Sequence, residues 1–163
     1  MTPDQATAVA TVLGQQLQNE WMTTVKVIEA IPEVNKLWKP EAKSRSAWEL
    51  AVHLCESDVW FLDSVLHQHF GEPAASGATT VTELAAWYKA HMPAKLEQVL
   101  ALDGTHLAAL VDFFNFKMPN AQYLVFCAVH GAHHRGQLSA YLRPMGGKVP
   151  SIYGGSADEP YQM

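Results

Sequence analysis

Four long stretches of helical periodicity constrain the fold of this 163-residue chain more than any other feature. Apolar residues recur mostly three and four positions apart over about residues 2–31, 46–70, 80–102 and 120–143, a spacing that gathers them on one face of a helix. Each stretch opens with a helix start signal. We therefore predict an all-α protein, a four-helix bundle, with ligand or metal sites in the core between facing helices.

Capping boxes open three of the four predicted helices. In this motif a Ser or Thr side chain and a Glu or Gln three residues later each satisfy a free backbone N–H group. The pairs are Thr2 with Gln5, Ser46 with Glu49, and Thr80 with Glu83. The fourth helix begins near Asn120, a residue type that suits the N-cap position.

Proline and glycine mark most of the predicted helix ends. The stops, in chain order, are Pro32, Gly71 to Pro73, and Pro144 with Gly146 and Gly147. Pro93 is expected to kink the third helix. Residues 103–119 are apolar without a clean period and form either a strand or a packed loop, and the tail 148–163 is irregular.

Length and composition indicate one globular domain over residues 1–163, with 48% apolar and 17% charged residues. The net charge of −5 and the 11 scattered Lys and Arg residues argue against a nucleic-acid surface. No stretch approaches the ~20 apolar residues that a membrane span needs, and no targeting segment is recognisable. We expect a cytoplasmic protein with neither nucleic acid nor membrane as a partner. Cys55 and Cys127 lie in apolar helical patterns, which favours free buried thiols.

The densest group of histidines lies in the fourth predicted helix. His130 and His134 are four residues apart, so their side chains lie one above the other and can chelate one ion. His133 is about 100° round the helix from His134 and is the weaker candidate. The pair shares its face with apolar residues, and two buried imidazoles need partners. Taken alone, the spacing is as compatible with chance as with metal binding.

His53 in the second helix strengthens the interpretation. Apolar residues on both sides of it place it on or beside the core face. Three inward histidines from two facing helices form a typical first shell for a catalytic metal ion, with positions left for water or substrate. The set is therefore His53, His130 and His134. The remaining alternative is a bundle without metal, in which carboxylates or water bind the three imidazoles.

Other metal motifs do not fit the sequence. A zincin protease needs His-Glu-x-x-His, and Gly131 stands where the glutamate would be. Paired Glu-x-x-His motifs of di-iron bundles are missing, and neither cysteine has the spacing of a structural zinc or blue-copper site. Three imidazoles accept several divalent metals, so the residues alone leave the ion open.

Several neighbouring side chains have two possible roles. Glu49, Ser57 and Gln137 lie one turn from a candidate ligand and can orient its imidazole, although a helix cap is the favoured role of Glu49. Arg135 and Arg143 can hold an anionic substrate group or, more ordinarily, pair with a carboxylate.

Tyr141 lies on the same helix face as the paired histidines and is expected in the core. Residues 152–154 either help to close the site or merely pack. The remaining histidines are expected to face solvent; these are His67, His69, His91 and His106.

The sequence from His130 to Leu138 (HGAHHRGQL), with 141–143 (YLR) and 149–154 (VPSIYG), resembles the last helix and tail of the DinB superfamily, the DinB/YfiT-like metalloproteins. Trp48, Glu49 and His53 are similar to that family's second helix. The resemblance spans the chain in helix order, and its specific part is the H-x-x-x-H-R-G-Q signature with the upstream histidine.

The resemblance implies a four-helix bundle that commonly dimerises and holds one divalent metal ion, most often nickel or zinc, on His53, His130 and His134. Relatives include metal-dependent S-transferases that use a low-molecular-weight thiol and a thiol-dependent isomerase, whereas many members have no assigned reaction. We therefore expect a metal-dependent enzyme that activates a thiol or water to attack a small electrophilic substrate, as a thiol S-transferase or hydrolase. The alternative is a non-catalytic metal-binding or stress-response protein with a structural or sensory metal site.

Overall fold

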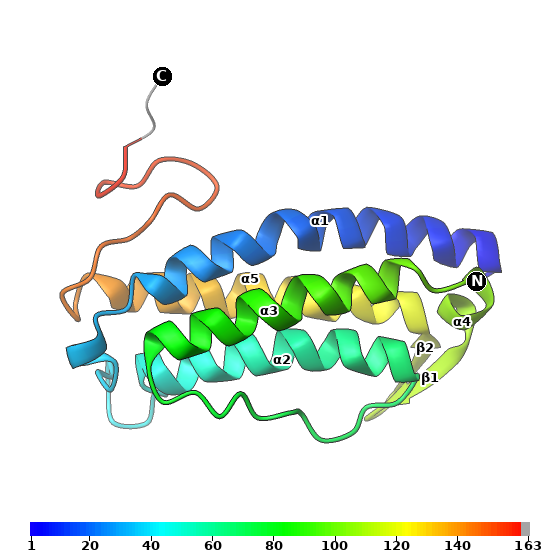
Figure 1. Ribbon diagram of the computed structural model, residues 1–163, viewed down its shortest axis with the longest axis horizontal. Coiled ribbons are helices and arrows are strands. Elements are labelled where there is room, and N and C mark those ends of the chain that lie inside the picture. The colour runs from blue at the N-terminus through cyan, green and yellow to red at the C-terminus, as the bar shows by residue number, and fades with distance from the viewer. Residues whose placement is uncertain (161–163) are drawn as a thin grey trace.

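The computed structural model describes residues 1–160. Within that range the long helices are α1 (Pro3–Glu29), α2 (Ala47–His67), α3 (Val81–Leu100) and α5 (Tyr123–Leu142). The short elements are the 3-10 turns η1 (Glu33–Asn35) and η2 (Asn120–Gln122), the helix α4 (Gly104–Ala108), and the strands β1 (Leu110–Phe113) and β2 (Phe116–Pro119). The long helices lie lengthwise beside one another (Figure 1). The chain is thus mostly helical, as predicted, with a strand hairpin that an all-α description omits.

The three predicted capping boxes are confirmed. Thr2, Ser46 and Thr80 are the N-caps of α1, α2 and α3, and each receives a hydrogen bond from the backbone N–H three residues later. The Gln or Glu side-chain oxygen at that third position accepts a hydrogen bond from the backbone N–H of the cap residue. Three helix starts are therefore determined by local sequence.

The predicted cap of the fourth helix is wrong. Asn120 lies in η2, and α5 begins three residues later, at Tyr123, without a side-chain cap. Asn120 is fully buried, and its amide donates to the backbone carbonyl of Val65, near the end of α2, at 2.7 Å. The side chain therefore joins two distant parts of the chain instead of capping its own helix.

Helix α2 ends at His67, three residues before the predicted end at Phe70. Gln68 takes a left-handed backbone conformation with φ of 54°, and its N–H bonds back to the carbonyl of Ser64. A left-handed residue at this position terminates a helix, so the glycine and proline that follow are not needed for the stop.

Residues 103–119 owe their lack of a clean period to three short elements in succession. Asp103 caps α4 by accepting hydrogen bonds from the backbone N–H groups of Thr105 and His106, at 2.8 and 2.9 Å. The antiparallel strands β1 and β2 follow and pair Phe113 with Phe116 across the turn. A four-residue strand is too short to show a period of two clearly.

The N-terminus, α4 and the hairpin lie at one end of the long helices, and the segment after α5 lies at the other end (Figure 1). The connection from α2 to α3 runs back along the helices, so that these two helices point the same way. Ser76 and Gly71 fasten this connection to α2, through hydrogen bonds with the Glu56 carboxylate at 2.7 Å and the Trp60 indole at 2.6 Å.

Helices α2 and α5 make the most extensive contact of any pair of elements and run antiparallel. Helix α1 packs on α3 and α5. Gly14 of α1 is buried at the contact with α3, where a Cβ would overlap the Leu100 side chain. Leu54, Leu62 and Leu138 are among the side chains that are fully buried in the core. Burying each such side chain contributes roughly 1.5–3 kcal/mol to folding.

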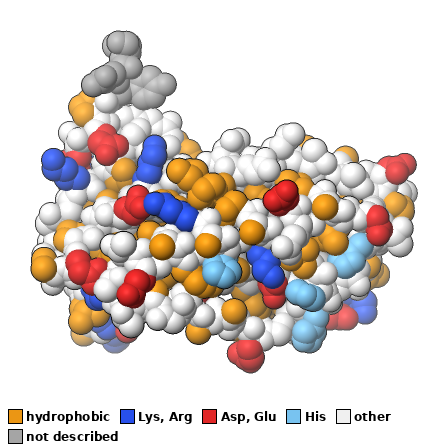
Figure 2. All heavy atoms as spheres, viewed as in Figure 1, with side chains coloured by type: hydrophobic (Ala, Val, Ile, Leu, Met, Phe, Trp, Pro, Cys, Tyr) orange, Lys and Arg blue, Asp and Glu red, His pale blue; other side chains and the backbone are white. Residues whose placement is uncertain are grey.

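The distribution of surface charge and the state of the two cysteines agree with what the sequence predicts. Charged side chains on the face seen in Figure 2 are scattered among hydrophobic ones and do not gather into a patch of one sign. Cys55 and Cys127 are free and buried, as predicted. Across residues 1–160, each helix is too short or too polar to span a bilayer.

Candidate metal centre

The structure brings the three predicted histidines together. His53 comes from α2, and His130 and His134 come from successive turns of α5. One nitrogen of each ring lies within 4.8 Å of the other two, and the Nε2 atoms of His53 and His130 are 3.2 Å apart. All three side chains are partly buried, so they are shielded but still reachable from solvent. The cluster can hold a metal ion.

The antiparallel packing of α2 and α5 explains why residues so far apart in sequence meet. His53 lies near the start of α2, opposite the middle of α5, where His130 and His134 project one turn apart on the same face. The distance between ring centroids is 5.0 Å for His53 and His130, 4.7 Å for His53 and His134, and 4.4 Å for His130 and His134. The two helix faces thus meet at the cluster.

The second ring nitrogen of every histidine in the cluster has a partner from this chain. Nδ1 of His53 hydrogen-bonds the Ser57 hydroxyl at 3.3 Å, and Nδ1 of His134 bonds the Gln137 side-chain oxygen at 2.8 Å. Nδ1 of His130 lies 3.4 Å from the Asp58 carboxylate. With each Nδ1 engaged, Nε2 is the nitrogen left for a metal, and the partner fixes the tautomer that makes this possible.

Asp58 is the site residue that sequence reasoning missed. Its side chain is 3% exposed, and one oxygen faces His130 while the other accepts a hydrogen bond from the Tyr88 hydroxyl of α3 at 2.9 Å. Burial raises the pKa of the Asp58 carboxyl, and its bonds with His130 and Tyr88 oppose that rise. An acidic residue inside a largely apolar helix was the available signal, because a buried carboxylate needs a polar partner.

Gly131 makes room for that carboxylate. A Cβ at Gly131 would lie 3.4 Å from both Asp58 carboxylate oxygens, the near limit of ordinary contact. A side chain larger than methyl would push Asp58 away. The position that excludes a zincin motif in the sequence therefore has a structural reason to be small.

The electrostatics of the cluster favour neutral imidazoles. Burial, together with the positive charges of Arg45 and the two neighbouring histidines, lowers the pKa of His53 to about 4. Burial also lowers the pKa of His134, against the effect of its bond with Gln137. Neutral imidazoles keep the nitrogen lone pair that metal coordination requires.

The geometry fits a first-row divalent ion. Zinc–imidazole bonds of about 2.0–2.1 Å at tetrahedral angles place two ligand nitrogens roughly 3.4 Å apart. The Nε2 atoms of His53 and His130 are at 3.2 Å, close to that value, and the ligand nitrogen of His134 lies within 4.8 Å of both histidines. Three protein ligands leave a fourth position for water or substrate, which is typical of catalytic sites.

The remaining candidates have structural roles. Glu49 caps α2 and does not reach His53, as favoured from its position. Arg135 is 2% exposed and binds the Glu20 carboxylate and the Thr24 hydroxyl of α1, and Arg143 pairs with Asp158 at 2.9 Å. Both arginines therefore form ion pairs with carboxylates of this chain, the more ordinary of the two roles expected for them.

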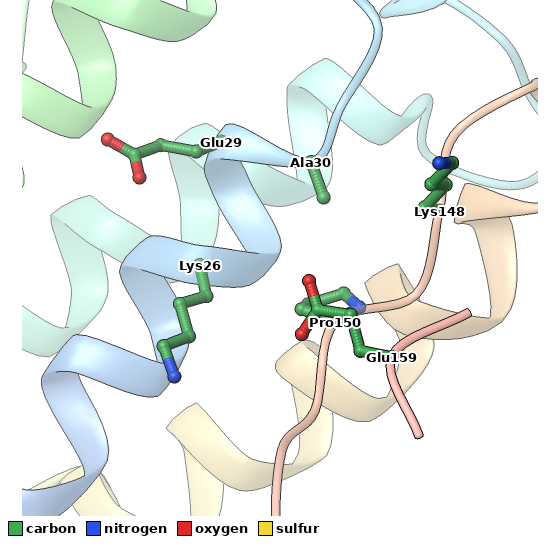
Figure 3. A pocket seen from close by; sticks show the side chains of 6 residues that line it. All are labelled: Lys26, Glu29, Ala30, Lys148, Pro150 and Glu159. Carbon is green, nitrogen blue, oxygen red and sulfur yellow. The ribbon is translucent and has the colours of Figure 1, made fainter. Parts of the chain in front are cut away.

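The tail packs against α1 and α5 through Tyr153. The Tyr153 hydroxyl bonds the Glu20 carboxylate at 2.8 Å and contacts Arg135, which connects the tail to α1 and α5. A pocket of about 410 Å³ separates the tail from the end of α1 (Figure 3). Figure 3 shows Lys26 and Glu29 on the helix side and Lys148 on the tail side. Packing, and not closure of the site, is the role the structure supports for residues 152–154.

The other histidines and Tyr141 lie outside the cluster. His133 is exposed, and Tyr141 packs edge-on against Trp38 with ring centroids 5.4 Å apart. His67, His69 and His91 are exposed as predicted. His106 is an exception, since it is partly buried and its Nε2 bonds the backbone carbonyl of Val65 at 3.0 Å.

Two solved structures of DinB-like proteins have this fold. The protein YjoA from Bacillus subtilis superposes with a TM-score of 0.71 at 22% identity, over 83% of this chain and 93% of that chain. A DinB-like protein from Bacillus cereus ATCC 10987 superposes with a TM-score of 0.74 at 24% identity, over 86% of this chain and 95% of that chain. At these identities the likeness supports the fold alone.

Sequence comparison supports the assignment to a family. The uncharacterized protein YrdA of Bacillus subtilis (strain 168) is 41% identical over 49 residues, which are 30% of this chain and 29% of YrdA. That match therefore spans less than a third of either protein. The sequence pattern that describes the DinB family matches residues 5–162, almost the whole chain. The chain belongs to the DinB family.

Proposed function

We propose that this protein is a metal-dependent enzyme of the DinB-like four-helix-bundle type, with one divalent ion on His53, His130 and His134. The observation that carries the proposal is the set of three imidazoles with each Nδ1 held by a partner from the chain. Histidines that merely fill a core have no need to bring three ring nitrogens to one point. Nickel and zinc are the ions we propose, from the family resemblance.

The ion would supply an open coordination position in which a thiol or water loses its proton near neutral pH. The chain's own residues prepare that position. Ser57, Asp58 and Gln137 orient the rings, and Tyr88 holds Asp58 from the far side. Phe61 packs against His130 with ring centroids 5.7 Å apart, which gives the centre an apolar wall.

The reaction we propose is attack of the activated thiol or water on a small electrophilic substrate, by a thiol S-transferase or a hydrolase. The resemblance to the DinB superfamily favours a low-molecular-weight thiol. The partly buried cluster is consistent with this, because a small thiol needs little space to reach it.

Cobalt substitution tests the open position directly. Cobalt-loaded protein is titrated with 2-mercaptoethanol, and the absorption spectrum is followed. We expect a new thiolate-to-metal charge-transfer band that saturates, and no band with His134→Ala. An unchanged spectrum with a fully occupied ion would contradict activation of a thiol and would favour the structural or sensory site.

We also propose a homodimer. Val12, Val125 and Val129 are 65%, 43% and 62% exposed on α1 and α5, beside an apolar groove of about 430 Å³ that Val9 and Leu13 help to line. Exposed apolar patches of this kind mark interaction sites. Light scattering after size exclusion should give twice the chain mass for the wild type and the single mass for Val12→Glu. A wild-type monomer would contradict the proposal.

A further inference from the structure

A second pocket, which the proposed function does not use, lies between the end of α2 and the hairpin. Its volume is about 420 Å³, and four aromatic rings and two carboxylates provide most of its lining. The rings belong to Trp60, Phe70, Phe113 and Phe114, and the carboxylates to Glu72 and Asp112. We call it the aromatic pocket.

The aromatic walls have fixed orientations. Trp60 meets Phe70 and Phe113 at steep angles, 72° and 63°, with centroid distances of 5.3 and 5.7 Å. The indole N–H of Trp60 donates to the carbonyl of Gly71 at 2.6 Å, so the polar edge of this ring is already satisfied. The pocket therefore offers aromatic surface that needs no further hydrogen bond from a ligand.

Phe114 lies at the tip of the hairpin and is 87% exposed, although it is a phenyl ring at the edge of the pocket. It is the first of the two residues that join β1 to β2, and its left-handed φ of 51° is the conformation that a two-residue hairpin turn requires there. Exposed aromatic surface beside a pocket is a feature of interaction sites.

The charge at the aromatic pocket is negative. Among its lining residues Glu72 and Asp112 carry charge, and both are acidic. Asp112 pairs with Lys117 at 3.2 Å, so the Lys117 ammonium offsets part of its charge and Glu72 contributes most of the negative charge of the pocket. Within residues 1–160, Glu72 forms no hydrogen bond or ion pair. The faces of aromatic rings are also electronegative.

We propose that the aromatic pocket binds a small organic cation with an apolar body, such as an alkyl- or arylammonium compound. The rings would contact the body and attract the cation through cation–π interactions, while the two carboxylates would repel an anion. The closest analogy in physical terms is an aromatic cage for a quaternary ammonium group.

The aromatic pocket is distinct from the metal centre, although aromatic packing connects them. Phe61 lies between, with centroid distances of 5.7 Å to His130 and 6.2 Å to Phe113. Cation binding needs neither the ion nor a free imidazole. The proposal therefore stands or falls independently of the proposed enzymatic activity.

Calorimetry with benzyltrimethylammonium chloride and with sodium 3-phenylpropanoate, an anion with a similar body, tests the proposal on metal-free protein. We expect saturable binding of the cation and at least tenfold weaker binding of the anion, as electrostatic complementarity requires. Phe114→Ala should weaken cation binding at least about threefold, the effect of one exposed cation–π contact. Glu72→Gln should weaken it and reduce its dependence on salt. Both side chains are exposed, so the variants should fold.

Two exposed residues outside the pocket lining provide matched controls. Phe116→Ala removes an exposed phenyl ring from the next strand, and Glu97→Gln removes an exposed carboxylate from α3, both outside the pocket lining. Neither should change cation affinity, and His134→Ala should bind the cation like the wild type. The proposal is overturned if the cation does not bind, if the anion binds equally well, or if the control variants weaken binding as much as Phe114→Ala.

Discussion

At the scale of single residues, Asp58 determines how the candidate metal centre is held. A carboxylate behind a histidine ligand orients the ring and raises its basicity, and such outer contacts are costly to lose. Asp58 has this position behind His130 and is itself held by Tyr88. The ring of His130 is therefore anchored through the core to a third helix.

Replacing Asp58 with asparagine should weaken metal binding about 10- to 100-fold, because the ring of His130 loses its charged partner while the shape is kept. Competition with a chromophoric chelator measures the affinity for zinc and nickel. Asp63→Asn, on the same helix but paired with Lys95 at the surface, is the matched control and should bind like the wild type. Equal affinities for the two variants would show that Asp58 has no part in holding the ion.

His53 should make the metal-free protein sensitive to acid. Its pKa in the folded protein is lowered from 6.5 to about 4, so between these values the unfolded chain binds more protons than the folded one. The free energy of unfolding should therefore fall as the pH decreases from 6.5 to 4. Urea denaturation at several pH values should show a shallower decrease for His53→Gln. A slope equal to that of the wild type would contradict the lowered pKa.

At the scale of elements, helix starts could be predicted because they depend on residues three positions apart, as in the pairs of Ser46 with Glu49 and Thr80 with Glu83. The start of α5 could not, because Asn120 is held by Val65, which is 55 residues away. The strand hairpin could not be predicted either, because strands of four residues depend more on pairing with each other than on their own sequence pattern. Local signals thus predicted three helix starts, and tertiary contacts determined the rest.

Removing the cap of α2 should cost stability without moving the site. Ser46→Ala leaves backbone N–H groups of the first turn unsatisfied and should lower the free energy of unfolding by about 1 kcal/mol. Ser44→Ala, which removes a bond to the Glu41 side chain at the surface, should change it by less than about 0.5 kcal/mol. Urea denaturation of the two variants compares them, and equal effects would mean that the capping box does not stabilise α2.

At the scale of the whole molecule, the packing of α2 on α5 turns three histidines separated by up to 81 positions into one cluster (His53 to His134). The meeting of the three histidines could be predicted from helical spacing and from an inward-facing His53, since both are properties of single helices. Asp58 and Tyr88 could not be paired from the sequence, because α2 and α3 meet only in the fold. The identity of the ion depends on chemistry that three imidazoles do not specify.

Metal content of the purified, untagged protein tests directly whether His53, His130 and His134 hold one ion. Elemental analysis after dialysis against excess nickel or zinc is applied to the wild type, His53→Ala, His134→Ala and the control His133→Ala, an exposed neighbour outside the cluster. We expect about one ion per chain in the wild type and in His133→Ala, and loss of the ion from the other two variants with their helical content unchanged. A wild type without metal, or equal metal content in all four proteins, would contradict this expectation.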